Sequence, residues 1–145
     1  MKSSTRQKGF TLIEIMVVVV ILGVLAAMVA PKILSRPDQA KVTVASSDIE
    51  TIAQALELFR LDNGFYPTTD QGLEALSSRP SLTPEAKNWN QEGYLKKTPQ
   101  DPWGNDYIYL QPGNHGRFDL YSMGSDGREG GDELARDITN WVEGS

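Results

Sequence analysis

The chain of 145 residues contains no cysteine and a single histidine, His115. Without cysteine it has no disulfide framework, no cysteine-ligated zinc and no thiol nucleophile. One histidine excludes a histidine-rich metal site and leaves few acid–base groups. The chain also lacks an excess of positive charge, because 14 Lys and Arg stand against 19 Asp and Glu. This balance argues against a protein that binds nucleic acid.

Charged and apolar residues are unevenly distributed along the chain. Residues 1–9 carry three basic residues and no acidic one, residues 10–30 are almost wholly apolar, and acidic residues predominate from Lys32 onward. The length leaves room for one ordinary domain after the apolar segment. The sequence therefore predicts a short basic leader, an apolar helix and a small acidic domain.

Residues 10–30 predict a membrane-spanning helix. Their only charged residue is Glu14, and as an α-helix they would extend about 30 Å, the thickness of a bilayer's hydrocarbon core. The basic residues before them place residues 1–9 in the cytoplasm and residues 32–145 across the membrane. The alternative is a secretory signal peptide, which has a shorter apolar core followed by small residues.

Glu14 is out of place in an apolar helix, because a carboxylate in the middle of a membrane costs about 2.5–3.5 kcal/mol. If a protease cut the chain after Gly9, the new α-amino group of Phe10 would lie one helical turn from Glu14. The two opposite charges would then neutralise each other. The alternative is a polar residue that is tolerated near a helix end.

The motif KGFTLIE, residues 8–14, resembles the class III signal of type IV pilins and of the pseudopilins of type II secretion. The resemblance implies cleavage after Gly9 by a prepilin peptidase and N-methylation of Phe10. It also implies that Glu14 sets the register with the N-terminus of a neighbouring subunit during filament assembly.

Residues 31–63 predict an amphipathic helix that continues the apolar one. Pro31 and Pro37 favour a kink, and Asn63-Gly64 predicts the helix end. Apolar residues in between recur at steps of about three and four. They are Val42, Val44, Ile49, Ile52, Ala53, Leu56 and Phe59.

Residues 64–145 predict a small globular domain with a thin core. Residues 106–110 and 117–122 are rich in β-forming residues and flank a turn with glycine and proline, which predicts an antiparallel hairpin. A third strand is not evident, and the apolar tail 138–142 is expected to pack back on the domain. The fold class is α+β, with a long N-terminal helix, transmembrane in its first half and amphipathic in its second, packed on a small antiparallel sheet. The pilin resemblance implies the same architecture.

Residues 123–137, called the acidic loop below, contain five acidic residues and four glycines. Calcium takes about six to eight carboxylate and carbonyl oxygens, and glycines let the backbone turn its carbonyls inward. The spacing does not match an EF-hand. The alternative is a solvated turn.

Segments of the C-terminal half, LYSMGSDGREGG (120–131), DITNW (137–141) and DPWG (101–104), resemble the major pseudopilins of type II secretion. In that family this loop binds a calcium ion, which replaces a missing disulfide. The resemblance therefore implies a C-terminal metal-binding loop. We expect Asp126 and Asp132 as side-chain ligands, backbone carbonyls near Met123, Ser125 and Gly131 as further ligands, and Glu133 and Asp137 as reserve ligands.

The resemblance implies a structural subunit that polymerises into the periplasmic pseudopilus of a type II secretion system and drives folded proteins across the outer membrane. Its implied partners are further copies of itself in a helical filament, minor pseudopilins, the inner-membrane assembly platform and the prepilin peptidase. Its implied location is the inner membrane, crossed once, with the N-terminus cytoplasmic and the C-terminal domain periplasmic.

Three alternative functions follow from the same residues. A type IV pilin is disfavoured by the absence of cysteine and by the acidic loop, and a minor pseudopilin is not excluded by Glu14. A membrane-anchored enzyme is the remote alternative. His115 lies in a glycine-containing turn, Ser46-Ser47-Asp48 has no base nearby in the sequence, and we expect no enzyme.

Overall fold

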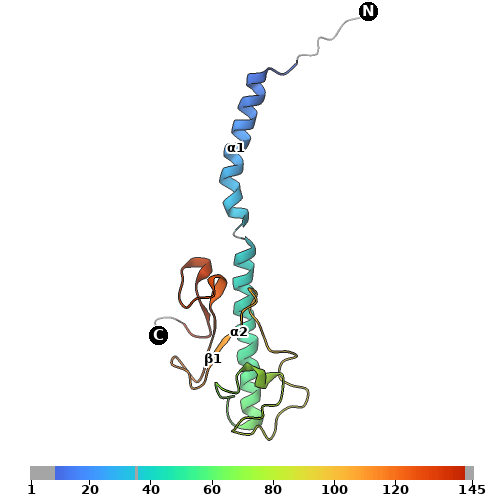
Figure 1. Ribbon diagram of the computed structural model, residues 1–145, viewed down its shortest axis with the longest axis vertical. Helices are drawn as coiled ribbons and strands as arrows, with labels where there is room; N and C mark the ends of the chain where they lie inside the picture. The colour runs from blue at the N-terminus through green and yellow to red at the C-terminus, as the bar shows by residue number, and fades with distance from the viewer. Residues whose placement is uncertain (1–8, 35, 143–145) are drawn as a thin grey trace, which may run out of the picture. The chain divides into compact units, whose positions relative to one another are not determined.

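The computed structural model describes residues 9–34 and 36–142, with side chains at all of these except 29–34 and 36. The chain forms two compact units, residues 1–37 and residues 38–145. The helices and strands of the two units are shown in Figure 1. In chain order they are α1 (Leu12–Leu34), α2 (Arg36–Asn63), the 3-10 helix η1 (Leu73–Leu76), β1 (Ile108–Leu110), β2 (Asp119–Ser122), the 3-10 helices η2 (Gly124–Asp126) and η3 (Glu133–Ala135), and β3 (Ile138–Thr139).

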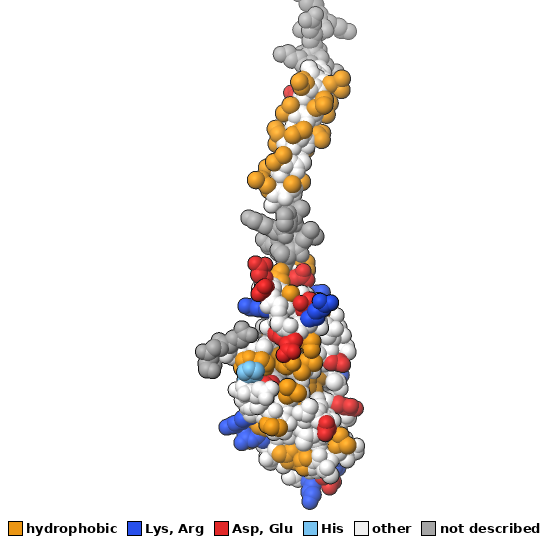
Figure 2. All heavy atoms as spheres, turned by 60° about the vertical axis from the view of Figure 1, so that its left-hand side comes forward, with side chains coloured by type: hydrophobic (Ala, Val, Ile, Leu, Met, Phe, Trp, Pro, Cys, Tyr) orange, Lys and Arg blue, Asp and Glu red, His pale blue; other side chains and the backbone are white. Residues whose placement is uncertain are grey.

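Helix α1 carries apolar side chains on every side. Its large apolar side chains from Leu12 to Met28 are all at least 50% exposed, and Figure 2 shows them along the visible face. Among the described residues, no helix has both the length and the apolar character to cross a membrane. The membrane-spanning helix predicted for residues 10–30 stays a prediction.

Pro31 and Pro37 lie at different positions within their helices. Helix α1 continues through Pro31 to Leu34, and Pro37 lies in the first turn of α2. The missing N–H of a proline costs no intrahelical bond in a first turn. At the other end, α2 stops at Asn63 as predicted, and Gly64 adopts a φ of +85° while its N–H donates to the Arg60 carbonyl at 2.7 Å.

Helix α2 packs one stripe of side chains into the core of the second unit. The stripe advances by three and four residues, which is the period of one helix face. It consists of Val42, Ala45, Ile49, Ile52, Leu56 and Phe59. Val44, which the sequence assigned to this stripe, is instead 49% exposed, because it falls between Val42 and Ala45 and points away from the core.

The sheet has the order β1-β2-β3 and is antiparallel throughout. Ile108 pairs with Tyr121 and Leu110 with Asp119, so the predicted hairpin is confirmed. The structure adds a third strand, β3, which was not evident in the sequence. It pairs Ile138 with Ser122 and brings the apolar tail back onto the domain. Ile138 joins Leu120 and Tyr109 in the core.

Tyrosine hydroxyls connect the sheet to the rest of the unit. Tyr107 donates to Asp48 of α2 at 3.1 Å, and Tyr109 donates to the Pro67 carbonyl at 2.7 Å. Burial, together with the negative charge of Asp48, raises the pKa of Tyr107, and burial raises that of Tyr109. Both hydroxyls therefore stay protonated, and remain hydrogen-bond donors, at pH values where a free tyrosine would ionise.

Candidate functional site

The predicted processing segment leads directly into α1. Gly9 is exposed and has open space around it, and Phe10 is 79% exposed. The structure thus leaves the predicted cleavage bond after Gly9 accessible within the first unit. The basic residues Lys2, Arg6 and Lys8 lie outside the described residues.

Thr11 forms the N-terminal cap of α1. Its Oγ1 accepts a hydrogen bond from the Glu14 N–H at 3.3 Å, and its carbonyl accepts bonds from Glu14 and Ile15. A threonine followed three residues later by glutamate is the sequence signature of a capping box. Residues 11–14 of the motif therefore already carry the signal for this cap.

The cap places Glu14 in the first turn of α1. The first turn carries the positive end of the helix dipole, which stabilises a nearby carboxylate by about 0.3–1 kcal/mol. Glu14 is exposed, as are its apolar neighbours Ile13 and Ile15. The structure therefore presents one exposed negative charge at the start of an exposed apolar helix.

In the second unit, the acidic loop follows β2 and folds back on itself. Gly124 adopts a φ of +67°, and a Cβ there would lie 2.7 Å from the Arg136 carbonyl oxygen. Gly131 adopts a φ of +93°, and a Cβ there would collide with the Ala135 carbonyl. Only glycine allows both the conformation and the close approach, so Gly124 lets the start of the loop lie against its end, and Gly131 closes a turn within its second half.

The predicted ligands do not form a carboxylate cluster. Asp126 accepts a bond from the Arg128 N–H at 3.1 Å, and the Asp132 carbonyl accepts one from Ala135 at 3.0 Å. In the part of the chain that the structure describes, no three acidic or imidazole side chains lie close enough together to hold a metal ion.

Asp137, predicted as a reserve ligand, has an unusual environment. Its Oδ2 accepts a bond from the Gly130 N–H at 2.9 Å, whereas its Oδ1 is buried with no hydrogen-bond partner among the described residues. An unsatisfied buried oxygen is costly, and it calls for an unseen partner such as water or a cation. The structure therefore gives Asp137 more weight than the sequence did.

A pocket of about 670 Å³ lies beside the loop, between it and the start of α2. Asp132, Glu133 and Asp137 line it together with Gly130 and Gly131. Asp126 is not part of its lining. The structure thus brings Asp132 to the same pocket as both reserve ligands and leaves Asp126 outside it.

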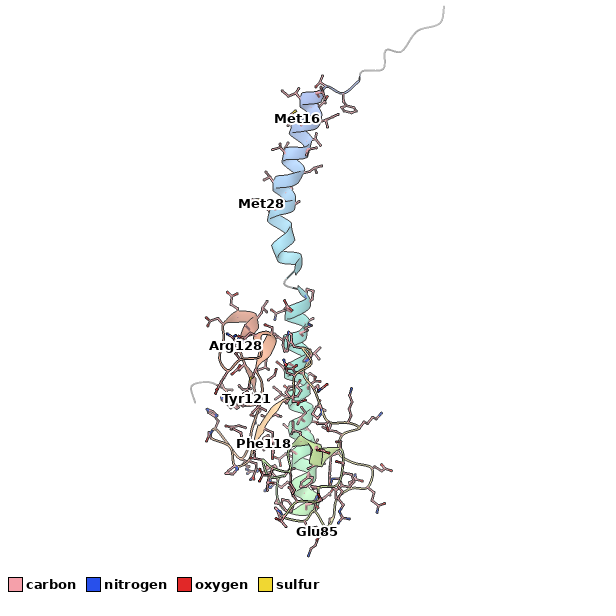
Figure 3. The ribbon with its side chains drawn as sticks, viewed as in Figure 1. Met16, Met28, Glu85, Phe118, Tyr121 and Arg128 are labelled. Carbon is pink, nitrogen blue, oxygen red and sulfur yellow. The ribbon has the colours of Figure 1, made fainter. Side chains whose placement is uncertain are left out.

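Negative charges in and near the loop act on Tyr121 of β2. Figure 3 shows Tyr121 on β2 and Arg128 in the loop that follows. Burial raises the pKa of the Tyr121 hydroxyl, and the negative charges of Glu129, Asp137 and Asp119 raise it further. An anionic tyrosine is disfavoured where negative charge is concentrated, whereas a cation is attracted there.

A buried carboxylate that the sequence analysis did not single out lies next to the loop. Asp101 is 5% exposed, and its Oδ2 accepts a 2.6 Å hydrogen bond from the Ser122 hydroxyl. The Ser122 oxygen in turn accepts a bond from the Gly124 N–H at 3.2 Å. The turn DPWGN marked Asp101 as a turn residue, but nothing in the sequence connects it with a serine 21 residues later.

The imidazole of His115 contacts both a carboxylate and an aromatic ring. Its Nδ1 lies 3.0 Å from Asp119 Oδ2, and its ring stacks on Trp141 with the centroids 4.1 Å apart. These contacts fix the hairpin turn against the C-terminal tail. They give the imidazole packing partners on both sides of the turn.

The chain was compared with known proteins. Residues 32–141 match the family described as "Type II secretion system (T2SS), protein G", and residues 4–30 match the "Prokaryotic N-terminal methylation motif". The "Type II secretion system core protein G" of Pseudomonas aeruginosa is 65% identical over 136 residues, which are 94% of this chain and 96% of that protein. The proteins of the same name from Vibrio cholerae and Escherichia coli are each 51% identical, over 97% of this chain and 96% and 95% of theirs.

A solved structure agrees with these matches. The major pseudopilin from the type 2 secretion system of enterohaemorrhagic Escherichia coli is 42% identical and superimposes with a TM-score of 0.65. The superposition covers 74% of this chain and 92% of that one. Family, relatives and fold all point to a structural subunit and not to an enzyme. The chain therefore belongs to the protein G family of type II secretion systems, the major pseudopilins.

Proposed function

We propose that this chain polymerises into the periplasmic pseudopilus of a type II secretion system and so drives folded proteins across the outer membrane. The observation that carries the proposal is an identity of 65% to a core protein G over nearly the whole chain. The exposed apolar helix α1 supports it, because such a surface needs neighbours in a filament or a membrane.

The N-terminal segment supplies the maturation and anchoring steps. A prepilin peptidase removes residues 1–9 by cleavage after Gly9, and Phe10 is then N-methylated; the match of residues 4–30 to the methylation motif supports both steps. Before assembly, residues 10–30 hold the chain in the inner membrane, with the N-terminus cytoplasmic and the C-terminal domain periplasmic. The basic leader and the apolar sequence support this orientation.

Glu14 acts in assembly. Its carboxylate pairs with the α-amino group of Phe10 on a neighbouring copy. This ion pair, formed among apolar side chains, sets the register of each incoming subunit. The capped first turn of α1 supports this role, since it fixes an exposed carboxylate at the helix start. Minor pseudopilins and the inner-membrane assembly platform are the other partners, and nucleic acid is not one.

The acidic loop holds a calcium ion that stabilises the second unit. The composition of the loop favours a hard cation such as calcium over a softer metal, because it offers carboxylates and backbone carbonyls and no sulfur. The unsatisfied buried Oδ1 of Asp137 supports the fit. Asp126 and Asp132 with carbonyls near Met123, Ser125 and Gly131 are the proposed ligands, and Asp137 ranks before Glu133 among the reserves. Bound calcium would offset the mutual repulsion of the five acids.

The assembly proposal is tested with Glu14→Ala, which leaves the cap intact because Thr11 bonds the backbone of residue 14. We expect normal cleavage and membrane residence, and loss of fibres and secretion. The control is Glu50→Ala, at an exposed position of α2, and this variant should assemble normally. Gly9→Leu should differ from both by leaving the leader uncleaved. Normal fibres from Glu14→Ala would contradict the proposed role.

A further inference from the structure

Asp101 is fixed within a closed turn that precedes β1. Its Oδ1 accepts hydrogen bonds from the N–H groups of Trp103 at 3.0 Å and Asn105 at 2.8 Å. Its own N–H donates to the Asn105 carbonyl, and its carbonyl accepts a bond from Gly104. The Asp101 carboxylate therefore has little freedom, and its second oxygen, Oδ2, is presented in a fixed direction.

That second oxygen faces Ser122, the last residue of β2. The Ser122 hydroxyl is fully buried and donates to Asp101 Oδ2, so its oxygen lone pairs face the backbone that follows. One of them accepts the Gly124 N–H. Because a hydroxyl that donates to a carboxylate becomes a better acceptor, Asp101 strengthens the bond that Ser122 makes to the loop.

Gly124 is the residue at which the two halves of the acidic loop meet. It is buried, has a left-handed φ of +67°, and lies directly against the carbonyls of Ala135 and Arg136. A rotation of the Gly124 peptide would separate the start of the loop from its end. The bond from Gly124 to Ser122 thus helps to hold the start of the loop against its end.

We infer that Asp101 is a positioning residue for the acidic loop, which it arranges for cation binding through Ser122 and Gly124. Asp101 does not itself bind the ion in this role. The effect on calcium affinity rests on the proposed calcium binding, whereas the effect on loop order does not. Partners that orient metal-binding groups from outside the ligand shell typically change affinity by about 10- to 100-fold when removed.

The variants Asp101→Asn and Ser122→Ala test the inference in the full chain, purified in detergent. The asparagine keeps one oxygen for the turn but presents an amino group to Ser122. The matched control is Asp119→Asn, because Asp119 is equally buried and also caps a turn, at the opposite end of β2. Calcium affinity is measured by titration calorimetry, and loop order by amide hydrogen exchange of residues 123–137 in chelator.

We expect Asp101→Asn and Ser122→Ala to weaken calcium binding about 10- to 100-fold and to speed exchange in residues 123–137. Asp119→Asn should change calcium affinity far less than Asp101→Asn does and should speed exchange mainly around residues 111–118. Equal losses of affinity in Asp101→Asn and Asp119→Asn would overturn the inference, because both would then act through general stability. If the unaltered chain binds no calcium, the metal proposal fails, and unchanged exchange in Asp101→Asn would also overturn the positioning role.

Discussion

Asp119 is a buried carboxylate that stays ionised because the hairpin turn surrounds it with donors. Burial by itself raises its pKa, but bonds from the Asn114 and His115 N–H groups and from the His115 ring outweigh burial and lower the pKa below its usual range. A carboxylate whose pKa is lower in the folded state stabilises the fold above the pKa of the unfolded state, about 4. That contribution is lost as the pH falls through the lower, folded-state pKa.

Asp119→Asn should therefore lower the free energy of unfolding by about 1–3 kcal/mol at pH 7, because two turn N–H groups lose a charged acceptor. The difference from the unaltered chain should shrink as the pH drops below about 4, because Asp119 takes up a proton first in the unfolded chain and, at still lower pH, in the folded one. Urea unfolding followed by near-ultraviolet circular dichroism at pH 7 and pH 3 measures both effects. Exposed Asp70→Asn is the control, and a loss that is equal at both pH values would contradict the role of the charge.

At the scale of the elements, the sequence predicted those that have a clear period or a clear stop signal. The end of α2 at Asn63 and the β1–β2 hairpin follow from such signals. Strand β3 has two residues, too few for any period, and it exists because Ile138 fills a place beside Ser122. Val44 was misassigned because β-branched apolar residues on both faces of a helix look alike in sequence.

The same reasoning explains which parts of the candidate site were predictable. The motif around Glu14 and the acidic loop are continuous in sequence, so their composition was visible. The contact between Asp101 and Ser122 joins two elements that only the folded sheet brings together. The unsatisfied Oδ1 of Asp137 likewise depends on burial, which a loop sequence does not reveal.

Helix α2 offers a matched pair that tests how its stripe is packed. Leu56 is fully buried, whereas Leu58, two residues later, is 53% exposed. Leu56→Ala should lower the free energy of unfolding by about 2–5 kcal/mol, since it removes buried methyl groups and leaves a cavity. Leu58→Ala should change it by less than about 1 kcal/mol. Thermal unfolding compares the two, and similar losses would mean that the packed face of α2 is wrongly placed.

At the scale of the whole molecule, the second unit has a small core and no cysteine to close its C-terminal segment. Its core combines the stripe of α2 with side chains of η1, of the three short strands and of the segments that flank them. Small domains bury a low fraction of their surface and commonly need a disulfide or a metal. The acidic loop has five carboxylates, and the Oδ1 of one of them, Asp137, is buried without a hydrogen-bond partner among the described residues. A metal bound in this loop would therefore add to the stability of the unit.

Calcium should therefore raise the unfolding temperature of the second unit in the full chain. An ion that binds only the folded state stabilises it by about 2.7 kcal/mol at a hundredfold excess over Kd, or roughly 10 °C for a domain of this size. Magnesium should substitute poorly, because it requires a tight octahedron and gives up its waters reluctantly. Melting is measured in chelator, calcium and magnesium, and an unchanged midpoint in all three would contradict calcium binding.

The ligands are tested in the same melting experiment. Asp126→Asn and Asp132→Asn should each abolish the rise in unfolding temperature that calcium causes, while exposed Glu92→Gln, outside the loop, should keep it. If Asp132→Asn keeps this rise in unfolding temperature and Asp137→Asn loses it, the loop does bind calcium, but through Asp137 in place of Asp132, as the buried unpaired oxygen of Asp137 suggests.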